Sequence, residues 1–504
     1  MIFNYGGLIM KYISTRNSAV SVDASAAIAR GISPDGGLFV PESFPALKEE
    51  DICALRKMSY IERADYILSL FLSDFTAEEI KSCVTGAYTG SFDNEQPAPI
   101  KRLDKNINVL ELWHGPTCAF KDLALQLLPY LLTVSVKKAS DGKKSVILVA
   151  TSGDTGKAAL EGFKDVPGTE IIVFYPSDGV SPMQKLQMDS QSGGNVHVCA
   201  IRGNFDDAQS GVKRIFTDSR IKQLLEQNGM EFSSANSINW GRLLPQIVYY
   251  VSSYCDMLER GDSLDGGFNV VVPTGNFGNI LAAYYAKKIG IPINKLICAS
   301  NANNVLTDFI RTGTYDRNRH FYTTMSPSMD ILISSNLERM LFELSGGNDK
   351  LIASLQAQLQ ESGKYTVDKD ILGKLQSLFY GGSCDDGQTV ETIRGVYEKY
   401  GYLCDTHTAV AFGVYNKYLA ETGDDRPTVI ASTASPYKFA KSVLSAVSDE
   451  KADDEFGYVR LLSKVTDTEI PKPIAALENA QVRFNDVCEK DALSSVVLSC
   501  LAIK

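Results

Sequence analysis

From about residue 106, two sequence patterns alternate along the chain, and this alternation leaves few folds open. Short apolar runs rich in β-branched residues are separated, in most places, by stretches of helical periodicity. The expected strands are residues 145–151, 170–176, 196–201, 268–274, 295–300 and 427–433. Strands that are apolar along nearly their whole length are typical of sheets covered by helices on both faces. The alternation therefore predicts an α/β fold with a largely parallel sheet.

The chain divides into three expected parts. Its 504 residues correspond to two or three domains, at roughly 150 residues per domain. We expect a smaller N-terminal α+β domain over residues 1–100, a main α/β region over 101–450 and a C-terminal helical segment over 451–504. Within the first part, periodicity predicts a helix over 46–72, and residues 94–103 are expected to be a linker.

Capping signals predict two further helix starts. Thr76 with Glu79, and Ser335 with Glu338, have the spacing of a capping box, in which each side chain satisfies a free backbone N–H of the other residue. The glycine-rich stretch 381–389 is expected to be a flexible connection.

Composition and charge exclude several function classes. The net charge is −10, whereas nucleic-acid binding depends largely on basic side chains. No run reaches the roughly 18 apolar residues of a membrane span. The ten cysteines include no C-x-x-C pair and the four histidines no helical metal pair, so neither a disulfide framework nor a metal site is expected. Such cysteines suit a reducing compartment, and residues 1–11 make a poor signal peptide, so we expect a cytoplasmic location. Met10 is an alternative start.

Two strand-to-helix turns share the layout Ser/Thr-Gly-Asp/Asn-x-Gly, at residues 152–156 and 274–278. Their glycines permit positive φ and close approach of the backbone. The helix that follows points free N–H groups and the positive end of its dipole at the turn. Neither turn is a P-loop or a dinucleotide-binding motif. Each alone is compatible with an ordinary turn, but two of one layout indicate two anionic groups near the same sheet edge.

The two turns differ in charge. Asp154 in the first turn repels a phosphate, although Ser152 and Thr155 beside it can donate hydroxyl hydrogen bonds. The second turn carries only neutral donors, in Gly275, Asn276, Phe277, Gly278 and Asn279. We therefore expect a permanently bound phosphate at the second turn.

Lys121 is a candidate nucleophile. It lies at a predicted helix entrance, between Phe120 and Asp122, a candidate cap. An amine in apolar surroundings has a lowered pKa and can form an imine with a carbonyl compound. The alternative is a surface lysine near a helix start. His114 and His407 are weaker acid–base candidates.

Two more segments place polar groups beside predicted helices. Ser237, Asn239 and Arg242 precede an apolar helix, and a guanidinium beside amide and hydroxyl donors suits a phosphate or a carboxylate. Thr433 ends a predicted strand, where ligands collect in parallel sheets. Helix capping explains Asn239 and Thr433 equally well.

Five motifs occur in order: HGPTCAFKD (114–122), TSGDTG (151–156), SANSIN (234–239), PTGNFGN (273–279) and TASPYKF (433–439). Together they resemble the threonine synthase family, pyridoxal-phosphate enzymes of fold type II. The stretch from ISTRNS to SFP (13–45) is similar to the N-terminal domain of that family. The resemblance implies fold type II, with mostly parallel sheets covered by helices. It also makes residues 101–450 a cofactor-binding catalytic region, with the active site between two subdomains.

The resemblance assigns the cofactor site. It implies that Lys121 is the Schiff-base lysine of pyridoxal 5′-phosphate, that residues 275–279 cradle the cofactor phosphate and that Thr433 contacts the pyridine nitrogen. Asp154 is expected beside the cofactor. Ser435 departs from the family pattern, which often has histidine at this position.

The resemblance also implies a substrate, O-phospho-L-homoserine, which a lyase of this family converts to L-threonine and phosphate in the last step of threonine biosynthesis. Ser152, Thr155, Asn239 and Arg242 would face it, with Arg242 at its phosphate and the freed Lys121 as general base. The nearest alternative is a relative that only eliminates phosphate, giving 2-oxobutanoate and ammonia. Another is an inactive phosphoamino-acid-binding protein. A monomer or homodimer is expected.

Overall fold

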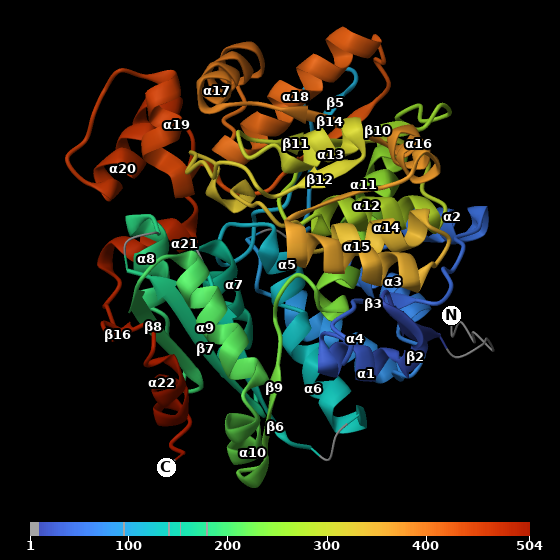
Figure 1. Ribbon diagram of the computed structural model, residues 1–504. Helices are drawn as coiled ribbons and strands as arrows, with labels where there is room; N and C mark the ends of the chain where they lie inside the picture. The colour runs from blue at the N-terminus through green and yellow to red at the C-terminus, as the bar shows by residue number, and fades with distance from the viewer. Residues whose placement is uncertain (1–9, 94–95, 140–141, 152, 178–179, 504) are drawn as a thin grey trace.

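The computed structural model describes residues 10–93, 96–139, 142–151, 153–177 and 180–503. Two mainly parallel sheets, each flanked by helices, lie in separate parts of the molecule (Figure 1). The predicted α/β fold is confirmed, and all six predicted strands are present within two residues of their expected bounds.

The larger sheet has six strands in the order β14–β11–β10–β15–β5–β4. Only β4 and β5 are antiparallel neighbours. Helices α12 and α18 pack against β10 and β11, and every residue of β10 is buried. The strand bounds, in sheet order, are Phe379–Ser383, Ile293–Ser300, Phe268–Pro273, Thr428–Ser432, Ile107–Glu111 and Ile100–Arg102, and the two helices are Gly278–Lys288 and Thr406–Thr422.

The smaller sheet is parallel throughout, in the order β16–β8–β7–β6–β9. Helices α7, α9 and α10 cover it, and α22 packs near its β16 edge. The strand bounds, in sheet order, are Val487–Glu489, Val196–Arg202, Thr169–Pro176, Lys144–Ala150 and Met230–Ser233. The helices are Asp154–Phe163, Phe205–Thr217, Ser219–Gln227 and Leu493–Cys500.

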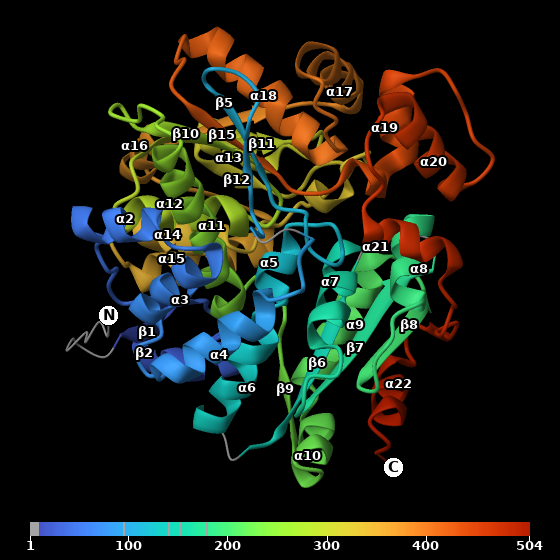
Figure 2. The same cartoon turned by 180° about the vertical axis from the view of Figure 1, so that it is seen from behind.

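The chain crosses between the sheets through α5 (Lys121–Leu125) and α6 (Leu128–Ala139), and returns through α11 (Trp240–Glu259). Helix α5 contacts both α7 and α11. Figures 1 and 2, which view the molecule from opposite sides, both place α5 between the two sheets. The first residue of α5 is therefore held between the two parts of the α/β region.

The N-terminal part has an antiparallel sheet, β2–β1–β3, and four helices. The single helix expected over 46–72 is wrong, because Ser59 caps a separate helix: its hydroxyl accepts from the Glu62 N–H, and the Glu62 carboxylate accepts from the Ser59 N–H. The capping box at Thr76 is confirmed. The strands are Asn17–Asp23, Lys11–Ser14 and Phe39–Pro41, and helices α1 to α4 are Ala24–Arg30, Glu49–Arg56, Tyr60–Phe71 and Ala77–Tyr88.

Two expected connections contain regular structure. Within the expected linker 94–103, Ile100–Arg102 form β4, which pairs with β5, while residues 94 and 95 lie outside the described residues. The stretch 381–389 supplies the end of β14 and, through Asp385, the cap of α17 (Asp386–Tyr400). A Cβ on Gly381 would lie 3.1 Å from the Thr307 Cα, so this glycine permits close packing of a helix on the strand rather than flexibility.

The helix expected after Ser335 is present as α14 (Leu337–Leu344), but no side chain caps it. The Glu338 carboxylate instead forms an ion pair with Arg16 of the N-terminal part, over 2.7 Å. Residues 451–504 contain helices, as expected, and also the edge strand β16, which was not expected.

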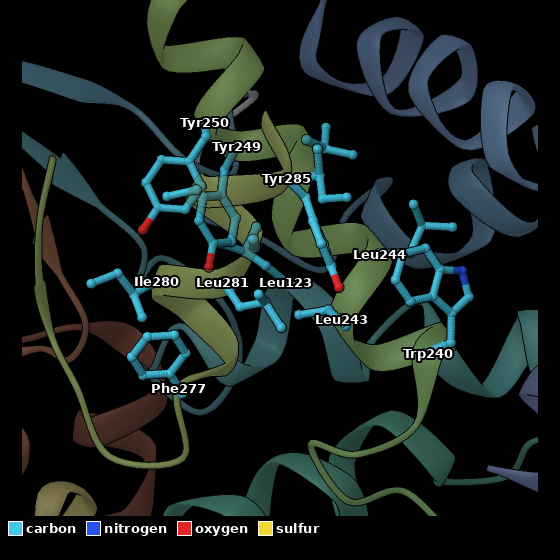
Figure 3. Packing of buried hydrophobic residues seen from close by; sticks show 14 of the residues in the cluster. Leu123, Trp240, Leu243, Leu244, Tyr249, Tyr250, Phe277, Ile280, Leu281 and Tyr285 are labelled. Atoms are coloured by element: carbon cyan, nitrogen blue, oxygen red, sulfur yellow. The ribbon is translucent and has the colours of Figure 1, made fainter. Parts of the chain in front are cut away.

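Helices α11 and α12 meet in an aromatic cluster (Figure 3). Tyr285 lies 5.9 Å from Trp240 between ring centroids, and Phe277, at the start of α12, packs 5.5 Å from Phe379 of β14. These rings fix the first turn of α12, which carries the second glycine turn. In the described part of the chain, no helix combines the length and the hydropathy that crossing a membrane requires.

Candidate active site

The two glycine turns follow inner strands of the two sheets: the first joins β6 to α7, and the second joins β10 to α12. Ligands in parallel sheets collect beyond the carboxyl ends of the strands, where both turns lie. The Ser328 hydroxyl donates to Asp154 over 3.2 Å, and the Ser328 carbonyl oxygen is 2.8 Å from where a Cβ on Gly275 would sit. Both turns therefore border one site.

Lys121 opens α5 and points its amine into this site. The residue is 8% exposed, and its Nζ donates to the Ser328 hydroxyl over 3.2 Å and to Asp154 over 3.5 Å. Burial lowers the pKa of Lys121, and the nearby Asp154 carboxylate only partly opposes this. Burial excludes the alternative of a surface lysine. A buried amine of lowered pKa has the chemistry needed to attack a carbonyl carbon.

The backbone that leads to Lys121 is held rigidly by Asp122. This residue does not cap α5 as expected; its carboxylate accepts from the Thr117 N–H over 2.9 Å and from the Thr117 hydroxyl over 2.6 Å. A Cβ on Gly115 would lie 2.5 Å from the Asp122 Cβ, so the turn closes only around a glycine. These contacts fix the backbone position from which the Lys121 side chain extends.

The second glycine turn presents an unused donor. Phe277 adopts φ +61°, and α12 begins immediately after it with Gly278. The Asn279 side chain is 7% exposed; its Oδ1 accepts from the Tyr250 hydroxyl, while its Nδ2 has no hydrogen-bond partner among the described residues. A buried amide donor without a partner is costly. A phosphate at this helix N-terminus would satisfy Nδ2 and the free backbone N–H groups together.

The first glycine turn presents a carboxylate that the protein itself neutralises. Asp154 Oδ1 lies 2.7 Å from Lys438 Nζ and accepts from Gln184 Nε2 over 3.1 Å. Burial alone would raise the pKa of Asp154, but the Lys438 and Lys121 ammonium groups hold it well below its ordinary value. This turn therefore offers a paired anion, not an open set of donors for a phosphate.

Of the residues expected to face the substrate, Arg242 and Thr155 remain candidates for that role, whereas Asn239 holds backbone groups of the protein. Arg242 is 5% exposed and donates from Nη1 to the Ala235 carbonyl over 2.9 Å; burial lowers its pKa to about 10, so it is still charged near neutrality. Thr155 is half-buried in the first turn of α7. The side-chain amide of Asn239 is already hydrogen-bonded within the protein. Its Oδ1 accepts from the Gly241 N–H, and its Nδ2 donates to the carbonyls of Ile28 and Ser234.

The two remaining expected residues are Ser152 and Thr433. Ser152 lies outside the described residues. Thr433 directly follows β15, is 5% exposed, and accepts at its carbonyl oxygen from the Phe120 N–H over 2.9 Å. This bond ties the end of β15 to the residue before Lys121, so Thr433 borders the site.

Sequence reasoning missed Lys438, Ser328 and Gln184, which surround Asp154. Lys438 lies within the TASPYKF motif, so the motif contained a signal that was not used. His407 was a weak candidate and reaches the site only indirectly: its Nε2 accepts from the Ser328 N–H over 3.1 Å, and its Nδ1 is 2.7 Å from Asp405 Oδ2. His114 lies between Asp93 and Glu111, each 2.9 Å away.

A buried amine of lowered pKa thus lies beside two turns at the carboxyl ends of two mainly parallel sheets, and one of these turns carries an amide donor without a partner among the described residues. An amine that can form an imine and a helix N-terminus that suits a phosphate are the groups that a phosphorylated aldehyde such as pyridoxal phosphate requires. The residues present fit that group, since Asn279 offers a buried donor and Lys121 a buried amine.

Comparison with known families agrees with this class. A family described as "Threonine synthase N terminus" matches residues 11–88, "Pyridoxal-phosphate dependent enzyme" matches 93–434, and "Threonine synthase, C-terminal" matches 408–497. A crystal structure of PLP-bound threonine synthase from Brucella melitensis superposes with a TM-score of 0.87 at 36% identity, covering 97% of this chain and 99% of that one.

Two curated relatives differ in how much of them the chain covers. Threonine synthase from Pseudomonas aeruginosa is 40% identical over 87% of this chain and 90% of its own length. Threonine synthase-like 1 from Pongo abelii is 42% identical over 85% of this chain, but the match spans only 58% of that protein. The chain belongs to the threonine synthase family of pyridoxal-phosphate dependent enzymes. The expected family, fold type II and cofactor are confirmed.

Proposed function

We propose that the protein converts O-phospho-L-homoserine and water into L-threonine and phosphate. The observation that carries this proposal is the position of Lys121, whose buried amine lies in the site that both glycine turns border. When bound, pyridoxal phosphate supplies an aldehyde for amines and a ring that withdraws electrons. In our proposal the turn at 275–279 holds the cofactor phosphate and Thr433 faces its ring nitrogen.

Lys121 is the proton carrier in this proposal. Its lowered pKa favours the neutral amine, and a neutral amine can accept a proton from carbon. The Ser328 hydroxyl, 3.2 Å from Nζ, and Asp154, 3.5 Å away, orient the amine. Lys121 and Asp154 are buried, which limits the access of bulk water to the proton transfer.

Arg242 is the proposed ligand of the substrate phosphate. A guanidinium has five N–H donors in a planar fork that matches phosphate oxygens. Among the described residues the Arg242 side chain donates only to the Ala235 carbonyl, which leaves donors for an anion. Since Asp154 makes the first turn a poor phosphate site, we assign the substrate phosphate to Arg242, and Ser152 and Thr155 remain proposed contacts of the substrate. Asn239 contributes by holding the backbone that precedes Arg242.

The second candidate function is elimination of phosphate without addition at the β-carbon, giving 2-oxobutanoate, ammonia and phosphate. The observation behind this candidate is that the chain matches a protein named threonine synthase-like 1 at 42% identity as well as a named threonine synthase at 40%. Both reactions consume one water and release one phosphate, so phosphate release alone does not separate them.

The test is product identification with O-phospho-L-homoserine and the cofactor-loaded protein. We expect threonine and phosphate in equal amounts. Equal amounts of 2-oxobutanoate, ammonia and phosphate would replace the first function with the second, and no phosphate release would contradict both.

The setting of the enzyme is part of the same proposal. We propose a cytoplasmic protein, because most of its ten cysteines are buried as free thiols, which suits a reducing compartment. The proposed partner is the small-molecule substrate, with the chain acting as a monomer or a homodimer.

A further inference from the structure

Lys438 is a fully buried cation that the proposed reaction does not use. It belongs to the short helix η2 (Pro436–Phe439), which follows Thr433 and is capped by Ser435. Its side chain is 0% exposed, its Nζ lies 2.7 Å from Asp154 Oδ1, and it also donates to the Thr117 carbonyl over 2.9 Å. Burying an ammonium group is unfavourable unless it is well paired. A lysine at this fully buried position therefore points to a role for its charge.

The Asp154 carboxylate has two sides with different partners. Oδ1 receives Lys438 and the Gln184 amide, whereas Oδ2 receives the Ser328 hydroxyl over 3.2 Å and Lys121 over 3.5 Å. The nearer cation is Lys438, not Lys121. Lys438 is therefore the main counter-ion of Asp154.

This division of partners matters for the charge of Lys121. With Lys438 in place, loss of the Lys121 proton leaves a balanced buried pair of one carboxylate and one ammonium. Without Lys438, the same deprotonation would leave the carboxylate buried with no cation in contact, so Lys121 would keep its proton. Only the neutral amine attacks a carbonyl carbon or accepts a proton.

We propose that Lys438 is a positioning residue that carries the charge of Asp154 and thereby frees the Lys121 amine to react. The charged groups that act on Lys121 are Asp154 on α7, Lys438 on η2 and Arg242 on α11. Lys438 and Arg242 favour the neutral amine, and Asp154 opposes them. The proposal rests on the proposed function only in taking Lys121 as the reacting amine.

The test measures cofactor uptake without any substrate. The full chain is stripped of pyridoxal phosphate, and the rate at which it takes the cofactor up is followed by visible absorbance across a pH series. In Lys438→Met we expect the midpoint of this pH profile to rise by about one unit or more, which makes uptake near neutral pH about tenfold slower. Lys438→Arg keeps the charge and should restore most of the rate.

Lys157→Met is the matched control. Lys157 is a second largely buried lysine, 8% exposed; it lies on α7 as Asp154 does and pairs with Glu161 over 2.9 Å. Its loss removes a partly buried ion pair of the same helix that does not involve Asp154, so stability should fall while the pH midpoint stays unchanged. An equal rise of the midpoint in the control would overturn the proposal.

The double variant Asp154→Asn/Lys438→Met removes both charges at once. We expect its midpoint to return close to that of the unmodified chain. An unshifted midpoint in Lys438→Met, or a double variant as shifted as the single one, would contradict the proposal. If Lys438→Met does not fold, recovery of both the fold and the midpoint in the double variant supports the proposal. Loss of the fold in both variants contradicts the proposal. None of these outcomes depends on which product the enzyme makes.

Discussion

The two glycine turns have the same sequence layout and opposite electrostatic character. In the first, Asp154 occupies the third position of the layout and draws Lys438 and Lys121 to within 2.7 and 3.5 Å. In the second, Asn276 occupies that position, and the nearby Asn279 amide has no partner among the described residues. One side chain thus decides whether such a turn binds the protein's own cations or stays open for an anion.

The comparison bears on where the second anion lies. The sequence indicated two anionic groups near one sheet edge, with Asp154 unfavourable for a phosphate at the first turn, and in the structure this carboxylate is paired with Lys438. Arg242, from a third element, is then the remaining cation for a substrate phosphate. Four variants break or sharpen this comparison.

Lys121→Ala removes the amine from the site that both turns border. We expect turnover to fall by roughly 10³-fold or more, because a residue that takes part in covalent chemistry and proton transfer has no substitute. The visible absorbance of the bound cofactor should disappear as well. Absorbance spectra and phosphate release measure the two effects, and a variant that keeps both would remove Lys121 from its role.

Arg242→Ala tests which element holds which phosphate. We expect KM for O-phospho-L-homoserine to rise about 100-fold, since a buried charged donor is lost, while the cofactor absorbance stays intact. Steady-state kinetics and a cofactor titration separate the two readouts. Loss of cofactor with unchanged KM would mean that Arg242 holds the other phosphate.

Asn276→Asp makes the second turn resemble the first. A carboxylate close to the bound phosphate should weaken cofactor affinity roughly 10- to 100-fold by like-charge repulsion. Equilibrium titration of the stripped chain with pyridoxal phosphate gives the ratio of dissociation constants. Unchanged affinity would show that the charge at this position does not distinguish the turns.

Gly275→Ala tests the contact between the second turn and the Ser328 loop. The added Cβ would meet the Ser328 carbonyl oxygen at 2.8 Å, so we expect a loss of about 1–3 kcal/mol in the free energy of unfolding. Gly373→Ala is the control, because a Cβ there meets nothing within 4 Å and lies inside helix α16 (Lys369–Leu378). The control should gain about 0.4–1 kcal/mol. Equal changes in both variants, measured by denaturant unfolding, would count against the contact.

The parts of the fold that were predictable are those with a local signal. Buried parallel strands are apolar along their whole length, so β6, β7, β10 and β11 were visible in the sequence. Strand β14 was not, because its sequence FYGGS resembles a loop. Only tertiary packing explains its glycines: Gly381 lies against Thr307 and Gly382 against Val414.

The site was predictable to the same extent. Lys121 and the 275–279 turn stand in motifs whose chemistry can be read locally. The contact between Lys121 and Ser328 joins residues 207 positions apart, and no pattern near either residue indicates it. Asn239 shows the converse, since its motif suggested substrate binding while its amide hydrogen bonds hold the backbone around α11.

The most direct test of the central claim traps the cofactor on the protein. The cofactor-loaded chain is treated with borohydride, which reduces the bond between lysine and cofactor, and the labelled peptide is identified by mass spectrometry. We expect one labelled peptide, with the added mass on Lys121. A label on another lysine, or no label on a protein that retains the cofactor, would contradict it.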